Sequence, residues 1–145
     1  MSSRRTRLVT ATPATVWEVL SDGWLYPLWV VGASRIREVD DSWPETGSKI
    51  HHSVGLWPAV LDDDTEVTSC VIGSLISLRA RAWPGGSADV TIQVRAEGAG
   101  ARITMEEDVA NGPARLAPRF LRTPALAWRN RESLRRLAWL AERRA

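Results

Sequence analysis

The amphipathic pattern of residues 124–143 constrains the fold more than any other part of the sequence. At 3.6 residues per turn, its apolar side chains gather on one face of a helix and its arginines lie on the flanks. Such a helix is about 30 Å long, roughly the width of a small domain. Its apolar stripe needs a partner, and a sheet is the only partner that the rest of the chain offers. The stripe consists of Leu126, Ala127, Leu134, Leu137, Leu140 and Ala141.

Asn130 lies at the centre of this apolar stripe. A buried amide must find a hydrogen-bond partner in protein, water or ligand, so Asn130 is a candidate site residue. Pro124 is expected in the first helical turn, where its missing N–H costs nothing. Trp128 and Trp139 fall on the opposite face of the helix. They cover a sheet edge, contact a second subunit or stay partly exposed, and a homodimer is therefore one hypothesis.

Composition narrows the class of protein. The 145 residues are expected to form one domain, residues 1–145, with a substantial core. The net charge is only +2 and no basic run resembles a phosphate-tracking stripe, which argues against a nucleic-acid partner. Cys70 is the single cysteine, so the sequence predicts neither a disulfide framework nor a cysteine-based metal site. We expect a soluble cytoplasmic protein without stable membrane insertion, because no signal peptide or long apolar run is recognisable. We also expect no metal and no cofactor.

The segments before the long helix predict a sheet preceded by short helices. Residues 4–11 predict a first strand, Thr12 and Pro13 predict the start of a helix that ends at Leu20, and residues 24–30 predict a second short helix or turn. About six strands then follow, joined by turns, and residues 62–64 are interpreted as a connection. These strands are residues 33–40, 47–57, 65–72, 75–83, 87–97 and 101–110. Packing of this antiparallel sheet against the helix gives a two-layer domain.

Glu107 is the sharpest polar signal on a predicted strand. Alternation places it on the same face as Ile103, Met105 and Val109, where a carboxylate is expensive unless it is paired. Three interpretations remain open: an acid/base group in a pocket, an ion pair with an arginine of the last helix, or a bulge that turns the side chain outward. Glu107 is therefore a candidate catalytic residue.

His52 is the second candidate catalytic residue. His51 and His52 are neighbours on one strand and point to opposite faces, so they cannot bind one metal ion together. His52 falls on the apolar face with Ile50, Val54 and Leu56. It is either a core histidine bonded to a backbone carbonyl or a member of a site.

His52, Glu107 and Asn130 are expected to converge in an otherwise apolar pocket, the usual arrangement of a small-molecule site. Eight tryptophans supply flat apolar surface, which suits a cavity wall or a plain core. Three of them lie near element ends and are candidates for the mouth of the pocket. The predicted ligand-binding residues are Trp29, His52, Val54, Leu56, Trp57, Trp83, Met105, Glu107, Asn130 and Leu134.

Several segments spread over nearly the whole chain carry a family resemblance: residues 11–17, 20–22, 29–32, 44–47, 98–108 and 129–134. In these segments the sequence resembles the START-like, or SRPBCC, superfamily in its polyketide cyclase/dehydrase and lipid-transport branch. The resemblance implies an α+β helix-grip fold: a seven-stranded antiparallel sheet wrapped around the long C-terminal helix, with two short helices after the first strand and a cavity for apolar small molecules. The family includes lipid and hormone carriers and aromatic cyclases.

Two main functions follow from these observations, and the fold does not choose between them. The first is binding of a hydrophobic or amphipathic small molecule, such as a lipid, a polyketide or an aromatic metabolite. The alternative is a polyketide cyclase or dehydratase, in which Glu107 and His52 act as acid/base groups and Asn130 orients a carbonyl. A regulatory partner protein with a vestigial pocket is a third hypothesis.

Overall fold

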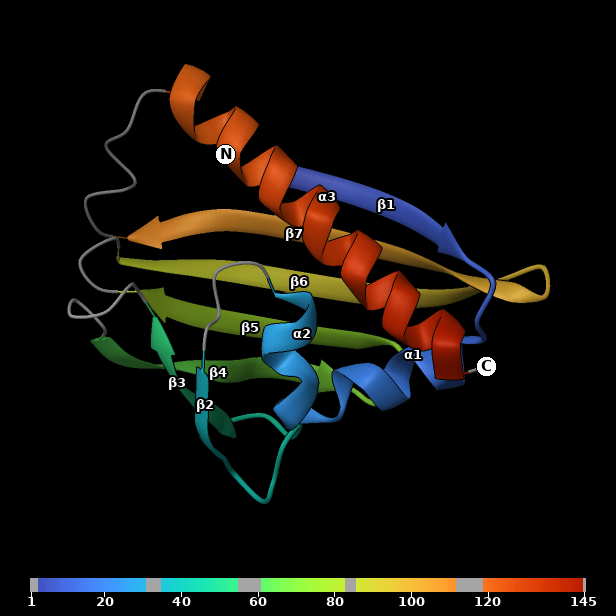
Figure 1. The fold of residues 1–145 in the computed structure, drawn as a ribbon, viewed down its shortest axis with the longest axis horizontal. Helices are drawn as coiled ribbons and strands as arrows, with labels where there is room; N and C mark the ends of the chain where they lie inside the picture. Colours follow the sequence, from blue (N-terminus) through green and yellow to red (C-terminus); the bar gives the residue numbers. More distant parts are fainter. Residues whose placement is uncertain (1–2, 31–34, 55–60, 83–85, 112–118, 145) are drawn as a thin grey trace.

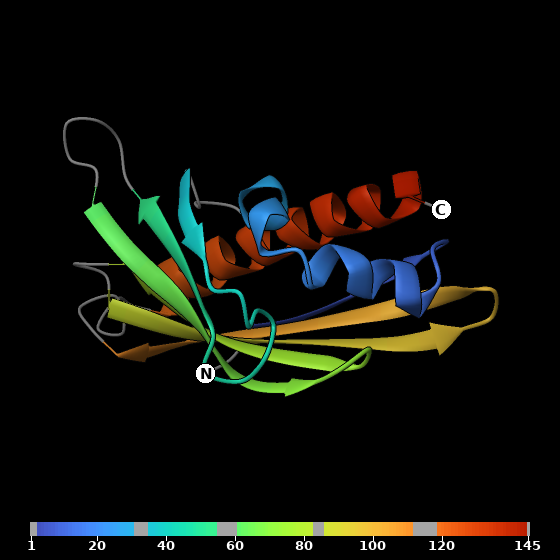
Figure 2. The ribbon, with the colours of Figure 1, turned by 90° about the horizontal axis from the view of Figure 1, so that it is seen from below.

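A computed structural model describes residues 3–30, 35–54, 61–82, 86–111 and 119–144. In these residues seven antiparallel strands form one sheet in the order β1-β7-β6-β5-β4-β3-β2, and the helices cover one of its faces (Figures 1 and 2). The elements are β1 (Ser3–Val9), α1 (Pro13–Leu20), the 3-10 helix η1 (Gly23–Leu25), α2 (Tyr26–Trp29), β2 (Arg35–Val39), β3 (Lys49–Val54), β4 (Leu61–Val71), β5 (Leu75–Ala82), β6 (Gly86–Glu97), β7 (Gly100–Asn111) and α3 (Arg119–Arg144).

The expected α+β helix-grip fold is confirmed. Helix α3 crosses the sheet diagonally in Figure 1. In Figure 2 the sheet is curved, and β2 and β3 rise toward the side on which the helices lie. The curvature lets one helix layer contact strands from both halves of the sheet, so side chains from α2, α3, β4 and β7 reach a common interior.

Local sequence explains the first helices. The Thr12 side chain accepts a hydrogen bond from the Thr15 backbone N–H at 3.3 Å, and Pro13 occupies the first helical position, as predicted. The Asp22 side chain caps η1 by accepting from the Trp24 backbone N–H at 3.1 Å. These caps fix where α1 and η1 begin. Helix α2 follows η1 directly and buries Tyr26 and Trp29.

The core lies between the sheet and the helices. On its sheet side, Val67 is paired with Leu78 and Ile92 with Met105, and all four side chains are buried. The inward face that alternation predicted for Met105 is confirmed. Such apolar side chains each contribute about 1.5–3 kcal/mol when they leave water. Helix α3 completes the core with the buried residues Leu134, Leu137, Ala138 and Ala141.

Two predicted boundaries are wrong. Strand β4 begins at Leu61, so the acidic residues 62–64 belong to the strand instead of a connection. Pairing with β3 supplies the backbone hydrogen bonds of this segment, and Lys49 of β3 lies 4.0 Å from the Asp64 carboxylate; these tertiary contacts override the weak strand propensity of aspartate. Helix α3 begins at Arg119, so Pro124 lies inside it and not in its first turn. The missing N–H removes one backbone hydrogen bond, which the remainder of this long helix tolerates.

Candidate functional site

A hydrogen-bonded group of three side chains lies in the core beneath α2. Thr65 Oγ1 of β4 is 2.9 Å from Nε2 of His52 on β3 and 3.3 Å from the hydroxyl of Tyr26 on α2. All three side chains are buried. The β3–β4 register pairs Ile50 with Thr65, which places His52 two residues further along β3, on the same face of the sheet. The rings of Tyr26 and His52 stack with their centroids 6.2 Å apart.

Tyr26 is held in its neutral form by this environment. Burial raises the pKa of Tyr26 to about 12, although the hydrogen bond with Thr65 acts in the opposite direction. The charge of Glu107 raises the pKa further and that of Arg129 lowers it. Tyr26 is therefore a neutral phenol near neutral pH, able to donate and accept a hydrogen bond.

Glu107 of β7 is buried, with 5% of its surface exposed, as its alternation predicted. Arg129 of α3 donates from Nη2 to Oε2 of Glu107, so the ion-pair interpretation of Glu107 is the one that the structure supports. Some 38% of the Arg129 side chain is exposed against 6% for Glu107, which places the pair at the edge of the interior. The other carboxylate oxygen, Oε1, is buried and has no hydrogen-bond partner among the described residues.

Asn130 has the complementary deficit. It follows Arg129 on α3, only 3% of its surface is exposed, and its Nδ2 is a buried donor that lacks a partner in the described part of the chain. Native proteins leave few buried polar groups unsatisfied, and each costs about 1–3 kcal/mol. Two such atoms, one on β7 and one on α3, are therefore the candidates for contact with a polar group from outside the chain.

The surroundings of these polar groups are apolar. Trp29, Met105 and Leu134 are buried. Trp29 contacts the Tyr26 ring edge-on, with centroids 5.5 Å apart. Met105 precedes Glu107 by two residues on the inner face of β7, and Leu134 lies one helical turn beyond Asn130 on α3. The core therefore combines a few hydrogen-bonding groups with large apolar side chains.

The predicted ligand-binding residues fall into two groups: those that the structure describes, and those whose side chains or whole residues lie outside its described part. Trp29, His52, Met105, Glu107, Asn130 and Leu134 are all buried between the sheet and the helices, but their ligand contacts stay predictions. Val54 belongs to β3, and its side chain is outside the described part of the structure. Leu56, Trp57 and Trp83 lie outside the described residues altogether.

Sequence reasoning missed Tyr26 and Thr65 as site residues. Extending the alternation of β4 backwards from Val67 identifies Thr65 as inward-facing. Tyr26 has no comparable signal, because its short helix is too brief for a periodic pattern. Arg129 was anticipated only as one of several arginines on the flanks of the last helix.

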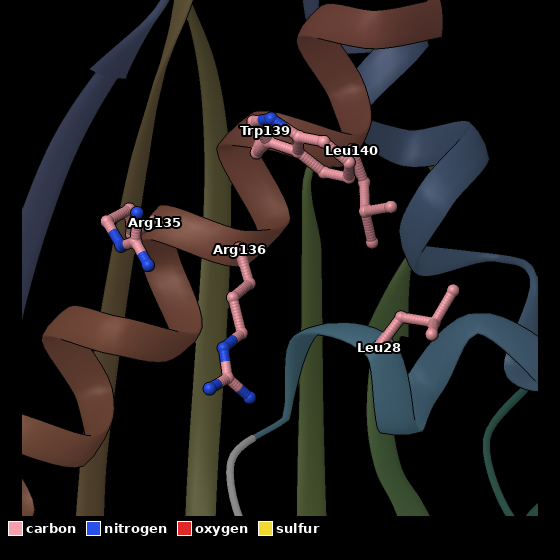
Figure 3. A pocket seen from close by; sticks show the side chains of 5 residues that line it. All are labelled: Leu28, Arg135, Arg136, Trp139 and Leu140. Carbon is pink, nitrogen blue, oxygen red and sulfur yellow. The ribbon is translucent and has the colours of Figure 1, made fainter.

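A separate groove of about 310 Å³ lies on the outer side of the helix layer, between α2 and α3 (Figure 3). Leu28 of α2 points toward Leu140 of α3 in this view. Arg135 and Arg136 both donate hydrogen bonds to Glu132, and these bonds lower the pKa of Glu132 to about 2. The residues that line the groove are Leu28, Arg135, Arg136, Trp139 and Leu140.

This groove is distinct from the interior pocket that the sequence predicts. Trp128 and Trp139 are each 56% exposed, in agreement with their predicted place on the outer face of α3. A homodimer contact at these tryptophans stays a prediction. Within the described ranges, no three His, Cys, Asp or Glu side chains group as metal ligands. No described helix is long and apolar enough to cross a membrane.

Comparison with known proteins identifies the family. Residues 1–142 match the family described as polyketide cyclase / dehydrase and lipid transport. No curated protein matches the sequence.

Three similar solved structures show the same fold. Protein CV1439 from Chromobacterium violaceum is 18% identical with a TM-score of 0.68, and the match covers 98% of each chain. Protein NE0264 from Nitrosomonas europaea is 14% identical with a TM-score of 0.76, and the match covers 99% of this chain and 96% of that one. StfQ, a di-domain ARO/CYC protein from the steffimycin biosynthetic pathway, is 12% identical with a TM-score of 0.76, and the match covers 99% of this chain and 51% of StfQ.

The family match over almost the whole chain and the helix-grip architecture agree with each other. The chain belongs to the polyketide cyclase/dehydrase and lipid-transport family of the START-like, or SRPBCC, superfamily.

Proposed function

We propose that the protein binds a hydrophobic or amphipathic small molecule, such as a lipid, a polyketide or an aromatic metabolite, between the sheet and α3. One observation carries the proposal: Oε1 of Glu107 and Nδ2 of Asn130 are buried in apolar surroundings and have no hydrogen-bond partner among the residues that the structure describes. The family to which the chain belongs supports the same ligand class.

The energetics favour a ligand with one polar end. Apolar atoms of the ligand gain about 25 cal/mol for each Å² that they remove from water. Its polar end satisfies the open groups on Glu107 and Asn130, each of which otherwise costs about 1–3 kcal/mol. Trp29, Met105 and Leu134 supply apolar contact next to these groups. A few placed polar groups among apolar walls are the usual composition of a small-molecule site.

Native mass spectrometry of freshly purified protein tests this proposal. We expect a copurified small molecule that is released when the protein is denatured, and lower occupancy in Asn130→Leu. Glu97→Gln is a matched control, because Glu97 is an exposed residue that pairs with Arg102. Protein that carries no small molecule, and that also fails to bind added lipids, fatty alcohols and aromatic polyketides, would contradict the proposal.

A second candidate function is a cyclase or dehydratase reaction on a polyketide-like substrate. The observation that favours it is the hydrogen-bonded series Tyr26–Thr65–His52, because a neutral phenol linked to an imidazole through a hydroxyl can deliver and recover a proton. Glu107 is the other acid/base candidate. If chemistry occurs here, Glu107→Gln and His52→Gln lose turnover but keep ligand binding; unchanged turnover in either variant rejects that residue as an acid/base group.

A further inference from the structure

The two open atoms in the core are of opposite hydrogen-bonding type. Oε1 of Glu107 is an acceptor and Nδ2 of Asn130 is a donor, and both are buried without a partner in the described part of the chain. Arg129, the neighbour of Asn130 on α3, holds the other oxygen of Glu107. The open atoms therefore lie where α3 crosses β7, and a group that satisfies both must donate to Glu107 and accept from Asn130.

Charge restricts that group further. Glu107 is a carboxylate engaged in an ion pair with Arg129. A second anion at this place would face a group of the same charge that only accepts hydrogen bonds. Like charges repel strongly when water is excluded. Arg129 donates to Glu107 through Nη2, and Tyr26 is a neutral phenol. An ionised ligand carboxylate has no proton to donate to Oε1 of Glu107 and carries the same negative charge.

We infer that the polar end of the ligand is uncharged and carries both a hydrogen-bond donor and an acceptor, as in an alcohol, an enol or a primary amide. The inference rests on the proposed function and names the polar group that the same site selects. Fatty acids, whose carboxylates are ionised at neutral pH, are rejected. Amphipathic molecules with a hydroxyl or hydroxy-carbonyl end are accepted.

Three probes of equal chain length test this selectivity on the wild-type protein: decanol, decanamide and decanoate, titrated at neutral pH by isothermal calorimetry. We expect the alcohol and the amide to bind about tenfold or more tightly than the carboxylate, which corresponds to at least about 1.4 kcal/mol. Decanoate binding as tightly as decanol overturns the inference while leaving the proposed function intact. If none of the three probes binds, the proposed function fails and this inference fails with it.

Glu107→Gln provides the sharper test, because it replaces the anion by a group that can also donate. Arg129 then loses its carboxylate partner and attracts an anionic ligand instead. We expect decanoate to gain about tenfold relative to decanol in this variant. Glu97→Gln removes a carboxylate from the exposed Glu97–Arg102 pair and should leave the preference unchanged. An unchanged preference in a folded Glu107→Gln protein overturns the inference.

Asn130→Leu is an independent variant should Glu107→Gln fail to fold. It removes the buried donor and introduces an apolar side chain of similar size. We expect decanol and decanamide to bind about fivefold more weakly and decanoate to be unaffected. Equal losses of affinity for all three probes would overturn the inference, because Asn130 would then support the shape of the site without hydrogen-bonding to the polar end of the ligand.

Discussion

Tyr26 gives the most quantitative prediction about the polar interior. Its hydroxyl is buried, and its pKa is raised from an ordinary value of 10.0 to about 12. The folded protein therefore holds the proton more tightly than the unfolded chain does. The stability that Tyr26 contributes is fully present below about pH 10 and is lost as the pH rises through about 12, because the unfolded state ionises first. A difference of about two pKa units corresponds to roughly 3 kcal/mol.

Two measurements check this value. Tyr26 is the single tyrosine of the chain, so tyrosinate absorbance titrates it alone. We expect the native titration midpoint about two pH units above that of the denatured protein. Denaturant unfolding should show a loss of stability at alkaline pH in the wild type that is smaller in Tyr26→Phe, and groups common to both proteins cancel in this comparison. A native midpoint near 10, or identical alkaline profiles for the two proteins, would refute the buried placement of the hydroxyl.

Three other substitutions test separate parts of the structure. Gly100→Ala should lose about 1–3 kcal/mol in denaturant unfolding, because a Cβ there lies 2.0 Å from the Val9 carbonyl oxygen and forces β1 away from β7; wild-type stability would contradict this contact. Asn130→Leu should gain about 1 kcal/mol in the ligand-free protein, since it removes a buried donor that lacks a partner in the described part of the chain; a clear loss would show that Asn130 is satisfied. Trp139→Ala should change stability by no more than about 0.5 kcal/mol because the side chain is exposed. Analytical ultracentrifugation of the same variant tests the homodimer hypothesis: if Trp139 holds a dimer, the variant sediments as a monomer where the wild type does not, and monomer profiles for both remove the idea.

Periodicity predicted the parts of the fold that depend on local pattern. Alternation along β7 was sufficient to predict that Glu107 is buried. Helical spacing correctly predicted that Asn130 and Leu134 face the interior and that Trp139 faces outward. These predictions hold because a side chain's face follows directly from its position in a regular element.

The remaining features depend on contacts between distant segments. Tyr26 meets Thr65 only because the caps of α1 and η1 bring α2 over β4. The sequence did not indicate which arginine of the last helix pairs with Glu107. Arg129 is the partner because it lies where α3 crosses β7. The start of β4 could not be predicted from its acidic sequence, because aspartate has a low strand propensity. Pairing with β3 makes that segment a strand.

The central claim is that Glu107 and Asn130 receive the polar end of a small molecule in the interior. A crystal structure of the protein with decanol tests this claim most directly. We predict that the hydroxyl donates to Oε1 of Glu107 and accepts from Nδ2 of Asn130, with the alkyl chain between the sheet and α3. Decanol bound only in the outer groove beside Trp139, with side chains filling the space at Glu107 and Asn130, would contradict it.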